Sequence, residues 1–339
     1  MSSATLKKDL LADFPRSRYT VLYHINLFAT ARTRRKPAIF KPCAEMRDVM
    51  YRSKTFGFTF DDYDNEECNV NTLFQSILTD NELPELEEII IGDWKDAWDD
   101  EAGSAQILID GILENKDRFS HIKSLFIGDM DFESCEVSWI IQGDYSRLWS
   151  ALPNLEKLVI KGSTNLELGN IAHEKLQHLE IICGGLPKSV IASVRDANLP
   201  SLKTLLLYIG VEDYGFDGDI STIKDLLAQS DFKELTYLGL TDSEIQDDVT
   251  EAVMQSGYIS QIETLDLSMG TLTDKGGRIL LDRLPEFPNI KNLNVEYHFL
   301  SDEMMEKLEN LPGIEVNADD QQEPDEYDGD IYYYPMLTE

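Results

Sequence analysis

The chain has 339 residues, of which 42% are hydrophobic and 27% charged, so it has a globular composition and room for two average domains or one extended repeat domain. It carries 30 Lys and Arg against 63 Asp and Glu, a net charge of −33. This balance argues against direct binding of nucleic acid or an anionic membrane by the main body, because phosphate contacts need clustered basic side chains.

The charge divides the chain near residue 55. Residues 1–54 hold 12 Lys and Arg and 4 Asp and Glu, a net charge of +8, whereas residues 55–339 hold 18 and 59, a net charge of −41. We therefore predict a basic N-terminal segment or cap over residues 1–55. The apolar run at 20–31 imitates a secretion signal only in part, because His24 and Asn26 interrupt it. A short helix or strand that packs on the following domain is the simpler interpretation.

Cysteine usage and hydropathy both favour the cytoplasm. The four cysteines lie far apart and form no CxxC pair, which argues against a zinc site or a disulfide framework and suits a reducing compartment. No run of apolar residues approaches the length of about 18 that crosses a membrane. The sequence therefore predicts a cytoplasmic protein that does not associate with membranes.

A short motif, apolar-x-x-apolar-x-apolar, recurs eight times along the chain. Its first positions are Leu86, Ile122, Leu155, Leu176, Leu202, Leu235, Ile262 and Ile290. Successive first positions are 36, 33, 21, 26, 33, 27 and 28 residues apart. The later intervals lie in or near the range of roughly 20–29 residues that is typical of leucine-rich repeats, and the longer ones require insertions.

The last three repeats agree in finer detail. An apolar residue, a polar residue and then an Asp follow each strand, and the three Asp residues are Asp247, Asp274 and Asp302. Each Asp opens a helix-like stretch, at 248–255, 275–284 and 303–311. Because Ser, Thr and Asp accept the unpaired N–H groups at a helix start, we predict that each unit is a strand, a loop, a helix and a return.

These units resemble leucine-rich repeats of the ribonuclease-inhibitor type. The sequences IGDW (91–94), IGDM (127–130), SWIIQGDYS (138–146) and DEYDGDIYYY (325–334) also resemble a family of bacterial cytoplasmic leucine-rich repeat proteins of unassigned function. The resemblance covers about residues 57–334. It implies an α/β solenoid, or horseshoe, with a parallel sheet on the concave face and helices on the convex face. The resemblance does not indicate any enzymatic reaction.

We therefore predict a leucine-rich repeat domain of about eight repeats plus caps over residues 56–317. Phe58 and Phe60 predict an opening strand, and Ile314 and Val316 a short closing strand, because a solenoid needs its terminal repeats covered. Residues 318–339 form an acidic, Tyr-containing tail. Its acidic spacing does not match a calcium loop, so it is either a solvated tail or a segment that docks on the last repeat through Tyr332–Tyr334.

Alternation along each strand predicts which side chains face the concave surface. The position between the two inward-facing apolar residues is Ile90, Phe126, Val159, Glu180, Leu206, Gly239, Asp266 and Asn294 in successive strands. Ile182, Tyr208 and Tyr237 flank the same face. An exposed apolar stripe usually marks a binding site, although loops or the N-terminal segment could cover it.

Acidic and aromatic residues are mixed in the loops after the first two repeat strands. The candidates are Asp93, Trp94 and Trp98 after the first strand, and Asp129, Asp131 and Phe132 after the second. Aromatic side chains anchor interfaces and charge steers the approach of a partner, so these loops favour contact with a basic protein. The alternative is that the aromatic rings pack under their own repeats.

No known catalytic, nucleotide-binding or metal-binding motif is present, and we predict no enzymatic activity, cofactor or metal. His178 beside Glu180 is the single acid–base candidate, and Cys135 is flanked by acids that make it a poor nucleophile. The leading hypothesis is a scaffold that binds a protein partner through the concave face and adjoining loops. The alternative is an acidic antagonist that imitates nucleic acid and competes for a basic nucleic-acid-binding protein.

Overall fold

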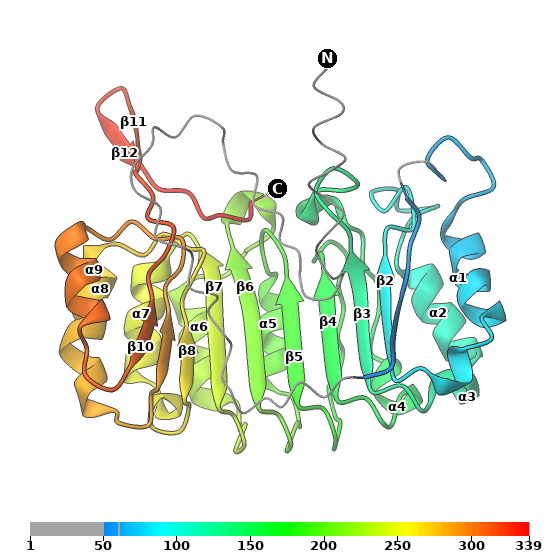
Figure 1. The fold of residues 1–339 in the computed structure, drawn as a ribbon, viewed down its shortest axis with the longest axis horizontal. Coiled ribbons are helices and arrows are strands. Elements are labelled where there is room, and N and C mark those ends of the chain that lie inside the picture. The colour runs from blue at the N-terminus through cyan, green and yellow to red at the C-terminus, as the bar shows by residue number, and fades with distance from the viewer. Residues whose placement is uncertain (1–50, 60–61, 339) are drawn as a thin grey trace, which may run out of the picture. The chain divides into compact units, whose positions relative to one another are not determined.

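A computed structural model describes residues 51–59 and 62–338; expectations about residues 1–50, including the run at 20–31 and Cys43, and about Phe60 lie outside these ranges. Within them a parallel sheet of ten strands runs in simple chain order, with helices on one side (Figure 1). The strands are β1 (Ser53–Phe56), β2 (Glu88–Gly92), β3 (Ser124–Asp129), β4 (Lys157–Lys161), β5 (His178–Ile182), β6 (Thr204–Gly210), β7 (Tyr237–Ser243), β8 (Thr264–Asp266), β9 (Asn292–Asn294) and β10 (Glu315–Asn317).

Helices connect most of these strands. They are α1 (Val70–Thr79), α2 (Gln106–Glu114), α3 (Lys116–Phe119), α4 (Leu148–Ala151), α5 (Lys188–Arg195), α6 (Ile220–Gln229), α7 (Gln246–Gln255), α8 (Asp274–Arg283) and α9 (Asp302–Glu309). Short 3₁₀ turns lie at Leu83–Glu85, Val137–Trp139, Glu212–Tyr214, Gly257–Ser260 and Leu284–Glu286. The connection between β4 and β5 is irregular instead of helical. No helix in the described ranges is long and apolar enough to cross a membrane.

The predicted strand register is confirmed. The eight predicted strands coincide with β2–β9, and one inward-facing residue per strand pairs with its counterpart in the next. This row is Ile89, Leu125, Leu158, Leu179, Leu205, Leu238, Leu265 and Leu293, and all of its members are buried in one hydrophobic core. Because strand side chains alternate, the adjacent row from Ile90 to Asn294 faces the other side of the sheet.

Neighbouring strands are also joined where they begin. The Glu87 carbonyl accepts the N–H groups of both Lys123 and Ser124, at 2.8 and 3.0 Å. The Gln177 carbonyl accepts those of Lys203 and Thr204 in the same way, at 2.8 and 2.9 Å. These shared carbonyls hold the repeats in register before the sheet ladder starts.

The three C-terminal helices are confirmed, but the prediction that Asp residues cap them is wrong. The N-caps of α8 and α9 are Thr273 and Ser301, whose side chains accept N–H groups of their own helices. Asp247 and Asp274 instead reach the N-cap residue of the next repeat, whereas Asp302 accepts the side-chain amide of Gln321 at 3.1 Å. Asp274 accepts the N–H of Ser301 at 2.8 Å and its hydroxyl at 2.7 Å.

Asp247 makes the same inter-repeat contact with more partners. Its carboxylate accepts the N–H of Thr273 at 2.9 Å, the Thr273 hydroxyl at 2.6 Å and the N–H of Gly276 at 2.9 Å. A Cβ atom at Gly276 would lie 2.6 Å from the Asp247 Oδ1, so a larger residue there would displace the Asp247 carboxylate. We call these contacts of Asp247 and Asp274 the inter-repeat clamps.

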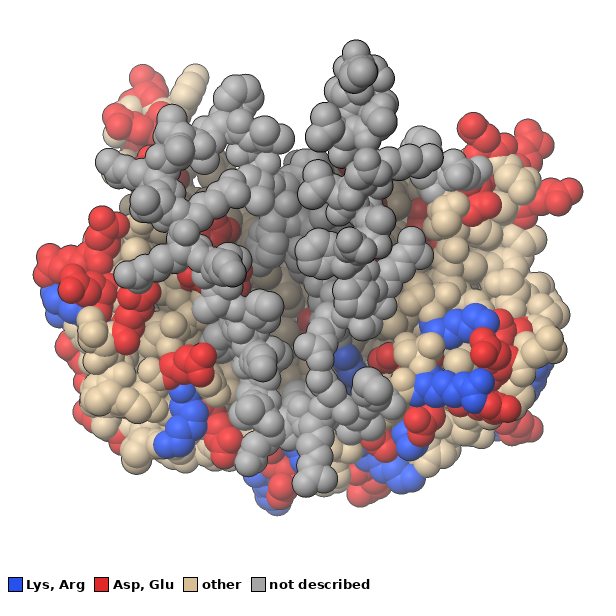
Figure 2. All heavy atoms as spheres, viewed as in Figure 1, with Lys and Arg blue, Asp and Glu red and all other residues tan. Residues whose placement is uncertain are grey.

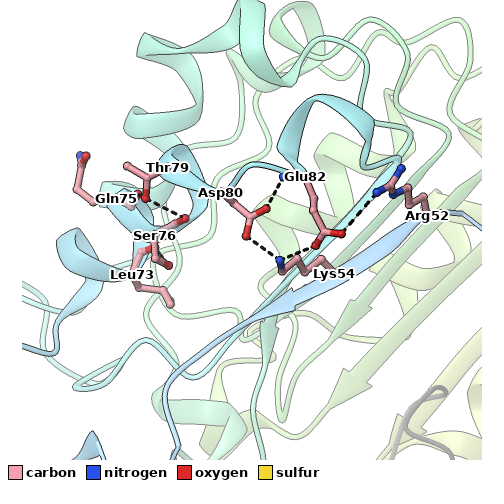
Figure 3. Close-up of polar contacts among 8 residues, drawn as sticks. All are labelled: Arg52, Lys54, Leu73, Gln75, Ser76, Thr79, Asp80 and Glu82. Atoms are coloured by element: carbon pink, nitrogen blue, oxygen red, sulfur yellow. Dashed lines mark hydrogen bonds and ion pairs between the residues drawn. The ribbon is translucent and has the colours of Figure 1, made fainter.

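The opening strand lies earlier than predicted. β1 ends at Phe56, which pairs with Ile91, so Phe58 lies beyond the opening strand, while the expectation for Phe60 falls outside the described residues. The boundary expected at residue 56 falls inside β1. Lys54 occupies the row of Ile89. Its Nζ lies 2.7 Å from carboxylate oxygens of both Asp80 and Glu82 (Figure 3).

This pairing explains how a lysine fits at the end of an apolar row. Arg52, the residue before β1, adds contacts with Glu82 and Glu85, as Figure 3 shows for Glu82. Inward-pointing charge on a terminal strand discourages another chain from pairing with it. β1 is thus a polar end to the described sheet.

The closing strand is confirmed, with Val316 of β10 paired to Leu293. The tail beyond it is ordered. β11 (Asp325–Tyr327) and β12 (Asp330–Tyr332) form an antiparallel hairpin at the end of the sheet where the strands finish (Figure 1). Residues 333–338 then return across the strand ends, where the N–H groups of Met336 and Leu337 donate to Met269 O and Asp242 Oδ1, each at 2.8 Å. Residues 333–338 therefore dock on the repeat domain, which was one of the two alternatives for the tail. The β11–β12 hairpin is exposed to solvent.

Candidate functional site

The helix-free face of the sheet carries the predicted concave row. Its apolar part contains Phe126 and Val159, which are buried but lie outside the main hydrophobic core. Tyr208 is buried as well, whereas Ile90, Ile182, Leu206 and Tyr237 are half-buried. Since Phe126 is only 7% exposed, this part of the face is not a bare apolar surface.

The C-terminal part of the same row is polar, as predicted, and its side chains form a hydrogen-bonded ladder. The Tyr237 hydroxyl donates to Asp266 Oδ2 at 2.5 Å, and Asn294 Nδ2 donates to Asp266 Oδ1 at 3.1 Å. Asn317 Nδ2 continues the ladder to Asn294 Oδ1 at 2.9 Å. Burial, together with the Asp266 carboxylate, raises the pKa of Tyr237 well above its usual range. The ladder rigidifies this half of the face.

The acid–base candidate is a hydrogen-bonded pair within β5. His178 Nε2 lies 3.0 Å from Glu180 Oε2, and both side chains are largely buried. His178 Nδ1 has no hydrogen-bond partner. Among the described residues, no group of three His, Cys, Asp or Glu side chains is placed to hold a metal ion.

The second candidate surface is the edge of the sheet where the strands end, which we call the carboxyl rim. Trp98 is 53% exposed and Phe132 51% exposed in the loops after β2 and β3, with Asp129 and Asp131 exposed beside them. The predicted acidic and aromatic loops therefore lie side by side at one edge, because parallel neighbouring strands finish there.

Trp94 and Asp93 do not belong to the exposed part of the rim. The Trp94 ring is fully buried, and its indole N–H donates to the Gly103 carbonyl at 2.5 Å. Asp93 is also buried, and its carboxylate accepts the N–H of Lys95 at 2.8 Å. The Trp94 ring therefore packs under its own repeat, which was the alternative to an exposed interface residue.

The sequence alone missed several exposed aromatic side chains. Trp139, in the loop between β3 and β4, is 59% exposed. Every large hydrophobic side chain that is exposed in the described residues lies on the carboxyl rim or on the hairpin beside it: Trp98, Phe132, Trp139, Tyr327, Ile331, Tyr332, Tyr333 and Tyr334. For Trp139, the signal available in the sequence was its place in the connection between two predicted strands.

The surface around the rim is acidic. Figure 2 shows Asp and Glu side chains gathered at both ends of this edge, one group over the β11–β12 hairpin. The Cys135 thiol lies in the loop after β3, and burial, with the nearby Asp93 and Glu136 carboxylates, raises its pKa to about 11. The prediction that Cys135 is a poor nucleophile agrees with this shift.

The sequential parallel sheet and its helix-bearing connections define the chain as a leucine-rich repeat solenoid protein, with the sheet on the concave face and the helices on the convex face. The crystal structure of a Bacteroides fragilis protein is similar to it at 39% sequence identity, over 85% of this chain and 77% of that one, with a TM-score of 0.75. The chain belongs to the family of this Bacteroides fragilis protein.

More distant structures share only weak similarity. An internalin from Listeria monocytogenes is 12% identical over 69% of this chain and 61% of its own, with a TM-score of 0.27. A leucine-rich repeat protein from Leptospira interrogans is 13% identical over 78% of this chain and 82% of its own, with a TM-score of 0.23. No protein-family description and no curated protein matches the chain.

Proposed function

We propose that the protein is a non-enzymatic scaffold that binds a protein partner through its carboxyl rim and the adjoining part of the concave face. The observation that carries this proposal is that, in residues 51–59 and 62–338, the exposed large hydrophobic side chains are confined to one edge. Aromatic side chains in contact surfaces contribute much of the binding energy when they become buried. A soluble protein rarely gathers them on one edge unless something binds there.

The partner in this proposal is a basic protein. Exposed carboxylates, including Asp129 and Asp131, surround the rim aromatics, and residues 55–339 have a net charge of −41. Complementary charge accelerates encounter and excludes acidic competitors, while the aromatic rings hold the complex together. The half-buried concave residues, Ile90 and Leu206 among them, extend the same surface if the partner reaches into the solenoid.

The proposal includes a cytoplasmic location and a bacterial family of leucine-rich repeats. Cys68, Cys135 and Cys183 are unpaired, which suits a reducing compartment. The alternation of strand and helix after β5 supports the ribonuclease-inhibitor type of repeat. We also propose that residues 1–55 form a separate basic segment or cap, with residues 56–317 and 318–339 as the repeat domain and its tail.

The experiment is a native pull-down from the source cells with three forms of the full chain. The first is the unaltered protein, and the second carries Trp98→Ser and Trp139→Ser on the rim. The control carries Glu251→Ser and Gln255→Ser, two exposed positions on α7. We expect a protein that the unaltered and control forms retain and the rim variant loses, still bound at about 0.15 M salt.

Two outcomes would contradict this proposal. Equal retention by all three forms would show that the rim tryptophans do not take part. Binding that disappears between about 0.05 and 0.2 M salt and ignores both tryptophans would favour the alternative of an acidic antagonist of a nucleic-acid-binding protein.

A further inference from the structure

The tail and the last repeat together form an open hollow that is lined by aromatic rings. Tyr297 and Phe299 come from the connection after β9, and Tyr332 and Tyr334 come from the end of the hairpin. The Tyr332 and Tyr334 rings are nearly parallel, with 6.5 Å between their centroids and an angle of 11° between their planes. The Tyr297 and Phe299 rings meet edge to face at 6.1 Å.

Contacts within the chain hold this hollow in shape. The Tyr297 hydroxyl donates to the backbone carbonyl of Tyr334 at 3.1 Å. Tyr333 packs its ring edge to face on Phe299, with 5.0 Å between centroids. The tail beyond is fastened to the ends of β7 and β8 by the N–H groups of Leu337 and Met336. The rings are therefore placed before any ligand arrives, which reduces the entropy cost of binding.

The charge of the hollow is unbalanced. Glu323 and Asp325 line it, and its lining includes no Lys or Arg. Neither carboxylate forms an ion pair with a described residue. Burial and the acidic neighbours Asp242, Asp320 and Asp325 raise the pKa of Tyr297 to about 12, as expected where the local potential is negative.

We propose that this hollow binds an arginine side chain from an exposed segment of the protein partner. A guanidinium is flat, stacks on aromatic faces and is weakly hydrated, whereas an ammonium is compact and strongly hydrated. The parallel rings of Tyr332 and Tyr334 offer a flat cation aromatic faces to stack against, and each ring attracts a cation within about 6 Å of its centroid. The carboxylates of Glu323 and Asp325 can accept its N–H groups. This inference rests on the proposed function and identifies the chemistry of one contact.

The test uses the full chain and three labelled pentapeptides, Gly-Arg-Gly-Arg-Gly and its lysine and citrulline analogues, followed by fluorescence anisotropy at about 0.15 M salt. The unaltered protein should bind the arginine peptide several-fold tighter than the lysine peptide, and the citrulline peptide least. The variant with Tyr332→Leu and Tyr334→Leu should bind the arginine peptide about tenfold more weakly. It keeps the net charge, and it keeps the contact with Tyr297, because that contact uses the Tyr334 carbonyl.

The matched control is Tyr327→Leu. Tyr327 is 75% exposed on the same hairpin but does not line the hollow, so its loss should change the affinity by less than twofold. Equal weakening by both variants, unchanged affinity in the double variant, or equal binding of the arginine and lysine peptides would each overturn the inference. None of these results affects the pull-down with the Trp98 and Trp139 variant, which tests the proposed function separately.

Discussion

The inter-repeat clamp at Asp247 offers a sharp test of how the repeats are joined. Asp247→Ala removes three hydrogen bonds to the next repeat, two from backbone N–H groups and one from the Thr273 hydroxyl. Each hydrogen bond to a charged group contributes about 1.5–3 kcal/mol, and partial exposure reduces the total. We expect the free energy of unfolding to fall by roughly 2–4 kcal/mol, because the N–H groups of Thr273 and Gly276 lose their acceptor.

The adjacent residue supplies the control. Asp248→Ala removes the same charge from the same first turn of α7, but it breaks only an exposed ion pair with Lys275, 2.7 Å long. Such pairs contribute at most about 1 kcal/mol, and the loss of helix-dipole stabilisation is similar in both variants.

Urea unfolding followed by circular dichroism measures both changes, and hydrogen exchange at the Thr273 and Gly276 amides reports the clamp directly. We expect faster exchange in the Asp247 variant alone. If the two variants unfold within about 0.5 kcal/mol of each other, the clamp does not join the repeats as argued.

Three further predictions concern the core, a buried acid and a tight loop. Leu205→Ala should cost about 2–5 kcal/mol of stability, whereas Leu206→Ala, on the other face of β6 and half-buried, should cost less than half of that; thermal melts compare them. Burial raises the pKa of Asp242 well above its usual range, so its contribution to stability is present below the unfolded-state pKa of about 3.9 and is lost as the pH rises through the folded-state pKa. Asp242→Asn keeps an acceptor oxygen but removes the titrating carboxyl group. The melting temperature of this variant should therefore change less with pH and should be higher at pH 7 than that of the unaltered protein. An unchanged dependence on pH would contradict the raised pKa of Asp242. Gly103→Ala should destabilise the loop after β2 by about 1–3 kcal/mol, because its Cβ would lie 1.6 Å from the Asp96 carbonyl oxygen, and tryptophan fluorescence should report the change.

Period-two alternation explains why the sheet was predictable. In every repeat strand the side chain that the pattern turned inward is buried, as at Leu125, and its neighbour Phe126 lies outside the main core. The opening strand was misplaced because Phe58 and Phe60 are more apolar than the true strand, in which Lys54 fills an inward position. A lysine can occupy this inward-facing position because its ammonium group contacts the Asp80 and Glu82 carboxylates, which the local sequence pattern does not show.

Contacts between repeats could not be predicted from sequence patterns within one repeat. An Asp at a helix start satisfies the capping rule within its own repeat, and nothing in the spacing shows that Asp274 turns to Ser301 of the next one. The sequence predicted only part of the exposed rim. Loop composition identified Trp98 and Phe132, but it could not distinguish them from Trp94, which is buried with its indole N–H bonded to the Gly103 carbonyl. The docking of the tail depends on acceptors such as Asp242, which lies 95 residues before its donor Leu337.

The returning tail changes how the C-terminal repeats can come apart. In an array whose units contact only their nearest neighbours, the terminal unit is free to fray by itself, and stability is a sum of intrinsic and nearest-neighbour terms. Residues 336 and 337 add links from the very end of the chain to β8 and β7, past β9 and β10. Opening the last unit therefore requires release from units that it does not adjoin. We expect β7–β10 to exchange their amide hydrogens as one cooperative block, because residues 336 and 337 link the tail to β8 and β7.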